Sequence, residues 1–149
     1  MVLLISKRLS FSINIIKRYV SSKPWSYEQA SAWIESFNKQ KIPKEHTTVS
    51  FSRSSGPGGQ NVNKVNTKVD LRLSLSKATW IPEYARDTLR SLPNVKKSKD
   101  DEVIITSDKT RSQSKNVQDC YDKLVTTIKQ AVAVPREPDE ATLRRVKQL

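Results

Sequence analysis

The sequence contains almost none of the residues that build disulfide frameworks or metal centres. Cys120 is its only cysteine and His46 its only histidine. One cysteine excludes an intrachain disulfide and a multi-cysteine zinc site, and one histidine excludes a histidine-rich metal centre. We therefore expect no metal and no cofactor. Both residues are interpreted as structural, because Cys120 falls on the apolar face of an expected helix and His46 begins an expected strand.

Glycine is equally scarce. The chain has three glycines, and all of them lie in the stretch SSGPGGQNVN, residues 54–63, as Gly56, Gly58 and Gly59. Glycine permits positive φ and close backbone approach to a ligand, so two glycines after the φ-restricted Pro57 predict a loop of one unusual shape. That loop would present Gln60. A neutral amide is a poor proton acceptor, but it can orient water, and a backbone N–H can stabilise a developing oxyanion.

Two familiar phosphate-binding loops do not fit this stretch. The Walker pattern needs Lys and then Ser or Thr directly after its second glycine, whereas Gly59 is followed by Gln60 and Lys64 by Val65. A dinucleotide fingerprint needs a third glycine in register and a βαβ unit, and neither is evident. An inert Gly-Pro turn is the remaining alternative.

Long hydrophobic runs are also missing. A membrane-spanning helix needs about 18 apolar residues, and Lys7 and Arg8 interrupt the first run. Residues 1–22 contain four basic residues, several serines and no acidic residue, which is the composition of a mitochondrial transit peptide. A secretory signal would place its charge before the apolar core. We therefore predict import into the mitochondrial matrix and no membrane span.

Basic residues outnumber acidic ones. Lys and Arg total 27 against 15 Asp and Glu, which gives a formal net charge of +12 and a pI of about 10.0. This balance favours a polyanionic partner such as nucleic acid, although a merely soluble basic protein would share it.

The pattern of apolar residues predicts one helix ahead of a small domain. SYEQASAWIESFNKQ, residues 26–40, begins with the capping-box spacing of Ser26 and Gln29, and Trp33 and Phe37 follow at helical spacing. We assign residues 23–45 to an N-terminal helical extension that packs onto the body.

Alternating and helical periods then predict the domain itself. Alternation predicts half-buried strands at 47–53, where Val49 and Phe51 alternate with hydroxyl residues, and at 68–75. Pro82 suits the first helical position of 82–92, a short strand follows at 102–106, and 114–132 reads as the long core helix. The apolar residues expected to face the core from that helix are Val117, Tyr121, Leu124, Ile128 and Val132.

This order, β-β-α-β-α, predicts an α+β domain over residues 46–134, with a three-stranded sheet packed on helices. The glycine-rich stretch then falls between two strands, and such long connections are usually functional or disordered. Residues 135–149 contain few apolar residues and are predicted to be a short, charged tail that is flexible in the free protein.

RSSGPGGQNVNKVNTKV, residues 53–69, resembles the GGQ signature of the catalytic domain of class I peptide-chain release factors. The likeness is greatest to the codon-independent branch, the release-factor-type peptidyl-tRNA hydrolases that rescue ribosomes in bacteria and mitochondria. It extends through TWIPEYARDTLRS and covers most of residues 42–134.

The resemblance implies a role for each residue of the motif. Gly58, Gly59 and Gln60 would enter the peptidyl transferase centre of the large ribosomal subunit, beside the P-site peptidyl-tRNA. There they would help water attack the ester that joins the peptide to the tRNA. The Gln60 backbone amide would stabilise developing charge and its side chain would place water. Gln60 is also a candidate for N-methylation, and no side chain needs to act as general base.

Basic and amide residues around the motif are candidates for RNA contacts. For each one a solvated strand face, or a role in shaping the loop, is the alternative. The candidates are Arg53, Asn61, Asn63, Lys64, Lys68, Arg72 and Lys77 near the motif, and Arg144, Arg145 and Lys147 in the tail.

The leading hypothesis is a ribosome-dependent, codon-independent peptidyl-tRNA hydrolase that releases nascent peptides from stalled mitochondrial ribosomes and is monomeric off the ribosome. One alternative is a non-catalytic RNA-binding component of the mitochondrial large ribosomal subunit, and another is a hydrolase of free peptidyl-tRNA. The rescue branch senses an empty messenger channel with a long basic tail, whereas residues 135–149 carry four basic and three acidic residues. The tail is therefore shortened, senses the channel weakly, or continues in a longer natural chain.

Overall fold

The computed structural model describes residues 22–53 and 66–148. The expected transit peptide, apart from Ser22, and the stretch 54–63 lie outside these ranges. Within them the elements follow in the order α2 (Tyr27–Ser36), η1 (Lys39–Lys41), η2 (Lys44–His46), β1 (Thr47–Ser52), β2 (Lys68–Ser74), α3 (Glu83–Ser91), β3 (Lys96–Lys97), β4 (Glu102–Ser107), α4 (Gln113–Val132) and α5 (Glu140–Lys147).

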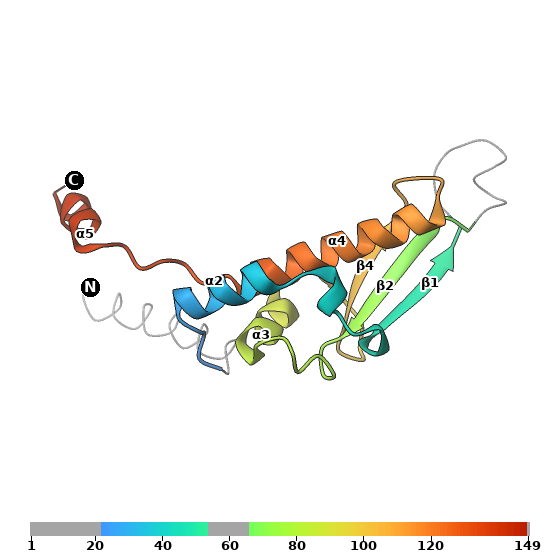
Figure 1. Ribbon diagram of the computed structural model, residues 1–149, viewed down its shortest axis with the longest axis horizontal. Coiled ribbons are helices and arrows are strands. Elements are labelled where there is room, and N and C mark those ends of the chain that lie inside the picture. Colours follow the sequence, from blue (N-terminus) through green and yellow to red (C-terminus); the bar gives the residue numbers. More distant parts are fainter. Residues whose placement is uncertain (1–21, 54–65, 149) are drawn as a thin grey trace, which may run out of the picture.

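The strands of the described ranges form one antiparallel sheet in the order β1-β2-β4-β3. The long helix α4 runs along one face of this sheet (Figure 1). The α+β class is therefore confirmed, as is the order of the elements expected from the sequence. The expected number of strands was wrong, because β3 adds a fourth strand at the edge.

The sheet and α4 pack on one another through apolar side chains that recur at strand spacing in β2 and at helical spacing in α4. In β2 the alternate residues Val69, Leu71 and Leu73 are almost completely buried, while the residues between them are half-buried. This is the period-2 pattern of a strand with one face on a core. The residues that α4 buries are Asn116, Cys120, Leu124, Ile128, Ala131 and Val132.

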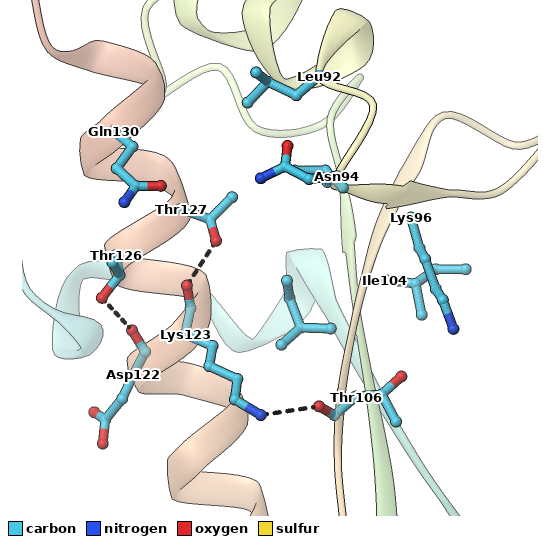
Figure 2. A pocket seen from close by; sticks show the side chains of 12 residues that line it. Leu92, Asn94, Lys96, Ile104, Thr106, Asp122, Lys123, Thr126, Thr127 and Gln130 are labelled. Atoms are coloured by element: carbon cyan, nitrogen blue, oxygen red, sulfur yellow. Dashed lines mark hydrogen bonds between the residues drawn. The ribbon is translucent and has the colours of Figure 1, made fainter.

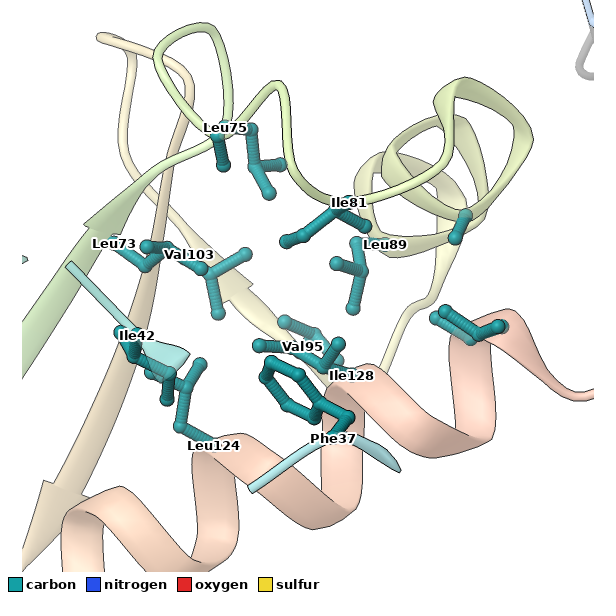
Figure 3. Close-up of a cluster of buried hydrophobic side chains, with 14 of the residues drawn as sticks. Phe37, Ile42, Leu73, Leu75, Ile81, Leu89, Val95, Val103, Leu124 and Ile128 are labelled. Carbon is teal, nitrogen blue, oxygen red and sulfur yellow. The ribbon is translucent and has the colours of Figure 1, made fainter. Parts of the chain in front are cut away.

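One part of the core lies where α3, α4 and the sheet meet (Figure 3). Leu73 and Val103 come from the sheet, Ile81 and Leu89 from the α3 region, and Ile128 from α4. Each is at most 1% exposed. Apolar burial on this scale supplies most of the stability of a domain of this size.

The N-terminal helix packs on this core through aromatic stacking. The capping box is present: Ser26 Oγ accepts from Gln29 N, and Gln29 Oε1 accepts from Ser26 N. Beyond it the rings of Trp33 and Phe37 stack at 4.5 Å, and Phe37 stacks on Trp80 at 5.6 Å. The expected packing is confirmed, but α2 ends at Ser36, because the chain turns at Asn38 into the short helix η1.

A hydrogen bond ties α3 to the end of α4. The buried Tyr84 hydroxyl donates to the carbonyl of Val132 at 2.6 Å, which satisfies one of the carbonyls left free at the end of a helix. Pro82 is the N-cap of α3 and not its first helical residue, because its ψ of 141° is extended. The expectation for Pro82 was thus wrong by one position.

The remaining differences lie at edges and ends of the domain. Phe51 is 45% exposed and not half-buried, because β1 is an edge strand and its second half lacks a covering element within the described residues. β3 consists of two exposed lysines, so no alternation marked it in the sequence. Part of the tail, which was expected to be flexible, forms a helix, α5, that buries none of its residues.

Candidate functional site

The glycine-rich stretch leaves and re-enters the domain at one end of the sheet. Ser52, the last residue of β1, lies opposite Lys68, the first residue of β2. The described residues that flank the connection at this end of the sheet are Arg53 and Asn66. Gly58, Gly59, Gln60, Asn61, Asn63 and Lys64 lie outside the described residues.

A buried asparagine holds the point where this connection rejoins the domain. Asn116, on α4, is 0% exposed, and its Nδ2 donates to the carbonyl of Thr67 at 2.7 Å. The same Nδ2 donates to the Thr110 carbonyl at 2.9 Å, and Oδ1 accepts from the N–H and the hydroxyl of Thr110, each at 2.9 Å. The amide thus uses both donors and both acceptor positions, so the buried group is fully satisfied.

A second contact fixes the neighbouring residue. Gln113 Nε2, in the first turn of α4, donates to the carbonyl of Asn66 at 2.8 Å. Ser112 caps the same helix by accepting from Lys115 N. The first two turns of α4 therefore clamp two successive backbone carbonyls at the exit of the glycine-rich connection.

A polar group buried beside this clamp joins β4 to α4. Ser107, 2% exposed and opposite Val69 in the sheet, donates its hydroxyl to Asp119 Oδ2 at 2.6 Å. Lys123 Nζ lies 3.0 Å from the same oxygen. The Ser107 hydrogen bond, followed by that of Lys123, lowers the pKa of Asp119 below its ordinary value. The carboxylate is therefore ionised at neutral pH.

The predicted RNA-binding residues of the domain lie near the site to different degrees. Arg53 is exposed beside the start of the connection, and Lys68 is half-buried at its end. Arg72 shares the face of β2 that points away from the core, but its Nη1 lies 3.5 Å from Glu102. Lys77 was expected near the motif, but it lies beyond the opposite end of β2, so the fold separates it from the site.

The tail residues form a separate group. Arg144, Arg145 and Lys147 are exposed on α5, which Figure 1 shows well away from the sheet. Arg144 pairs with Glu140 at 3.2 Å, and both side chains are largely in solvent. The fold does not bring these residues to the glycine-rich connection.

Several residues at the site were not predicted from the sequence. Asn116 interrupts an otherwise apolar stripe at four-residue spacing, and that polar residue on a core-facing helix position was the available signal. Three basic residues, Lys109, Arg111 and Lys115, are exposed in the same segment as Thr110 and Gln113, between β4 and the second turn of α4. The contact of Gln113 with Asn66 depends on tertiary structure.

A groove on the described surface lies elsewhere. It has a volume of about 520 Å³ and separates α4 from the β4 edge (Figure 2). Lys123 Nζ crosses it to the Thr106 carbonyl at 3.3 Å, and the hydroxyls of Thr126 and Thr127 donate to carbonyls of their own helix. Several of its polar groups are already hydrogen-bonded within the domain, so we do not assign it to the site.

The contacts of Cys120 and His46 fit structural roles. Burial raises the pKa of the Cys120 thiol to about 11, which makes it a poor nucleophile at neutral pH. His46 Nδ1 accepts a hydrogen bond from Trp80 Nε1 at 3.0 Å. Across residues 22–53 and 66–148, no group of three or more His, Cys, Asp or Glu side chains is placed to hold a metal. Nor does any helix in these ranges have the length and apolar character to cross a bilayer.

A domain with a glycine-rich connection between two neighbouring strands of a sheet matches a known family. The RF-1 domain model matches residues 35–148. This chain belongs to the RF-1 domain family, within the class I release factor GGQ superfamily. The resemblance carried by residues 53–69 is thereby confirmed.

Three individual relatives show how similar this RF-1 domain protein is to other proteins. The mouse large ribosomal subunit protein mL62 is 41% identical over 108 residues, which cover 71% of this chain and 52% of the mouse protein. A Saccharomyces cerevisiae protein is 36% identical over 136 residues, 90% of this chain and 67% of its own length. The Pseudomonas putida peptidyl-tRNA hydrolase ArfB is 32% identical over 108 residues, 71% of this chain and 78% of its own. The chain thus spans about half of the mouse protein and most of the bacterial one.

Proposed function

We propose that the protein is a ribosome-dependent, codon-independent peptidyl-tRNA hydrolase that releases nascent peptides from stalled mitochondrial ribosomes. The observation that carries the proposal is the glycine-rich connection of an RF-1 domain, held at its exit by Asn116 and Gln113. A loop whose base is held in this way could enter a distant site without moving the domain that carries it. The name of the ArfB relative supports the same activity.

The chemistry assigned to the motif is ester hydrolysis. Gly58 and Gly59 let the backbone approach the terminal ribose of the P-site tRNA, and Gln60 places the attacking water. The water oxygen bonds to the ester carbonyl carbon, and the bond to the ribose oxygen breaks. The Gln60 N–H stabilises the charge that develops on oxygen. The ribose hydroxyl of the released tRNA gains the proton that water loses.

The basic residues are assigned to RNA. Arg53, Lys68 and Arg72, together with Lys64, neutralise phosphates of the large-subunit RNA and position the domain over the peptidyl transferase centre. Arg144, Arg145 and Lys147 contact RNA separately through the tail. We place the protein in the mitochondrial matrix, reached by means of residues 1–22, and as a monomer when it is off the ribosome.

The decisive experiment compares cleavage of peptidyl-tRNA in the presence and absence of ribosomes that lack a codon in the A site. We expect cleavage only with ribosomes. Gln60→Ala removes the side chain that places the water, and Gly59→Ala restricts the backbone that positions the Gln60 N–H, so each should lower the rate by about a hundredfold or more. Ser55→Ala is the matched control in the same stretch. Equal rates for the wild-type protein and both variants would exclude the mechanism.

The name of the mouse relative favours a second candidate, a non-catalytic RNA-binding component of the mitochondrial large ribosomal subunit. A permanent component stays with the large subunit during sedimentation at high salt. A factor held through phosphates dissociates, because binding through several phosphates weakens steeply with salt. Retention at high salt together with absent hydrolysis would favour this candidate. Cleavage without ribosomes would instead point to a hydrolase of free peptidyl-tRNA.

A further inference from the structure

The helix α2 has an exposed face with a shallow apolar hollow of about 400 Å³. Its opposite face packs on the core through Ala30 and Ile34. The hollow is mainly apolar and contains two of the three tryptophans of the chain. Its lining residues are Trp25, Gln29, Ala32, Trp33 and Ser36. Large half-exposed aromatic rings around a hollow are typical of a surface that binds another apolar group.

The helix α5 also exposes its apolar residues. Leu143 is 46% exposed and Val146 is 63% exposed, and their spacing of three places them on one side of the helix. α5 has eight residues and buries none of them. Isolated helices of this length are marginal in water, so the helix gains stability only by packing on a surface.

The chain tethers the two helices to one another. Residues 134–137 line a groove together with residues 23–29, and the Arg136 guanidinium lies over the Tyr27 ring at 6.0 Å from its centroid. From there α5 begins only three residues later, a reach of about 10 Å. At 1.5 Å per residue α5 is about 12 Å long and α2 about 15 Å, so one can lie along the other.

The charges of the two helices are complementary. α2, YEQASAWIES, contains Glu28 and Glu35 and no basic residue. α5, EATLRRVK, contains three basic residues and one acidic residue. The formal net charge is therefore −2 for α2 and 3 − 1 = +2 for α5. Opposite charges that flank an apolar contact favour that pairing over others.

We propose that α5 docks within the same chain on the exposed face of α2, with Leu143 and Val146 in the hollow beside Ala32 and Trp33. Figure 1 shows the undocked arrangement, in which α5 stands at the end of an extended segment. In the docked form the basic residues of α5 lie against the carboxylates of α2. The contact is intramolecular, so the short tether raises the local concentration of α5 at α2. The docked form does not depend on the proposed hydrolase activity.

Disulfide trapping in the full chain tests the contact. In a Cys120→Ala background, Ala32→Cys is combined either with Val146→Cys or with Ala141→Cys, which lies on the opposite side of α5. Under one mild oxidant and at low protein concentration, we expect a monomeric disulfide to form about tenfold faster with residue 146 than with residue 141. Equal rates would overturn the proposal. So would a disulfide that forms only between two chains and increases with concentration, which would assign the hollow to a second copy.

The charge contribution has its own control. Glu28→Gln combined with Glu35→Gln should slow the residue 146 disulfide severalfold, and Glu45→Gln, outside α2, should leave it unchanged. Raising the salt concentration should have the same effect as the double substitution, because salt screens exposed charges. A rate unaffected by both the double substitution and the added salt would remove the charge argument. Far-UV circular dichroism of each variant checks that the fold is retained.

Discussion

Asn116 Nδ2 lies 2.7 Å from the carbonyl oxygen of Thr67, although the two residues are 49 positions apart in the chain. This hydrogen bond joins the long core helix to the exit of the glycine-rich connection. Because Asn116 is fully buried, the bond has no competition from water. A side chain inside the core thus fixes Thr67, the residue that precedes β2 at the end of the glycine-rich connection.

Replacing this amide should therefore affect both stability and function. Asn116→Leu leaves the Thr67 carbonyl and the Thr110 N–H buried without partners, so we expect a loss of about 2 to 4 kcal/mol in the free energy of unfolding. Urea denaturation measures it. Gln118→Leu, at an exposed position of the same helix, should change stability by no more than about 0.5 kcal/mol.

Asn116→Asp separates the hydrogen bonds that the amide accepts from the one that it donates to Thr67. The carboxylate still accepts from Thr110 but cannot donate to Thr67. We expect ribosome-dependent hydrolysis to fall through kcat, with little change in KM, at a temperature where the variant remains folded. An Asn116→Asp protein that is folded and fully active would contradict the positioning role.

Thiol reactivity should report the burial of Cys120. A pKa raised from 9.0 to about 11 lowers the thiolate fraction at neutral pH about a hundredfold, and burial also denies access to a reagent. We expect an aromatic disulfide reagent to label the native protein very slowly and the urea-unfolded protein at the rate of a free thiol. Fast labelling of the folded protein would show that α4 does not cover this residue as described.

Asp119 should contribute to acid stability. Its pKa is lowered in the folded protein, so its stabilising effect is complete above the ordinary aspartate value of 3.8 and is lost as the pH falls toward the lower folded value. Asp119→Asn should flatten the decline in stability below about pH 4, measured by urea unfolding at several pH values. Asp122→Asn, at a largely exposed position, is the control and should leave the decline unchanged.

The turn before β4 should depend on a backbone requirement as well as on an ion pair. Asp101 has a φ of 60° and accepts two hydrogen bonds from Arg90, both at 2.8 Å. Asp101→Ala and Asp101→Gly both lose the pair, but alanine keeps a β-carbon in the left-handed region, whereas glycine has none. We expect the alanine variant to be about 1 kcal/mol less stable than the glycine variant. Thermal unfolding of the two proteins provides the comparison.

The sequence predicted the elements that rest on long apolar patterns. The strands β1, β2 and β4 and the helices α2, α3 and α4 were expected within a few residues of their observed bounds, because period 2 and period 3.6 are properties of local geometry. The capping box at Ser26 is equally local. β3 escaped prediction because two exposed lysines have no period, and it exists only because Lys96 lies opposite Ile104.

By itself, the sequence determined the family, the α+β order and the position of the glycine-rich stretch between two strands. Each depends on residue types and spacings along one segment. Only the tertiary structure decided that Asn116 and Gln113 hold the exit of that stretch, that Lys77 lies at the far end of the sheet, and that α2 keeps an exposed aromatic face. The physical reason is that these relations join segments far apart in sequence, and packing fixes them only once α4 lies on the sheet.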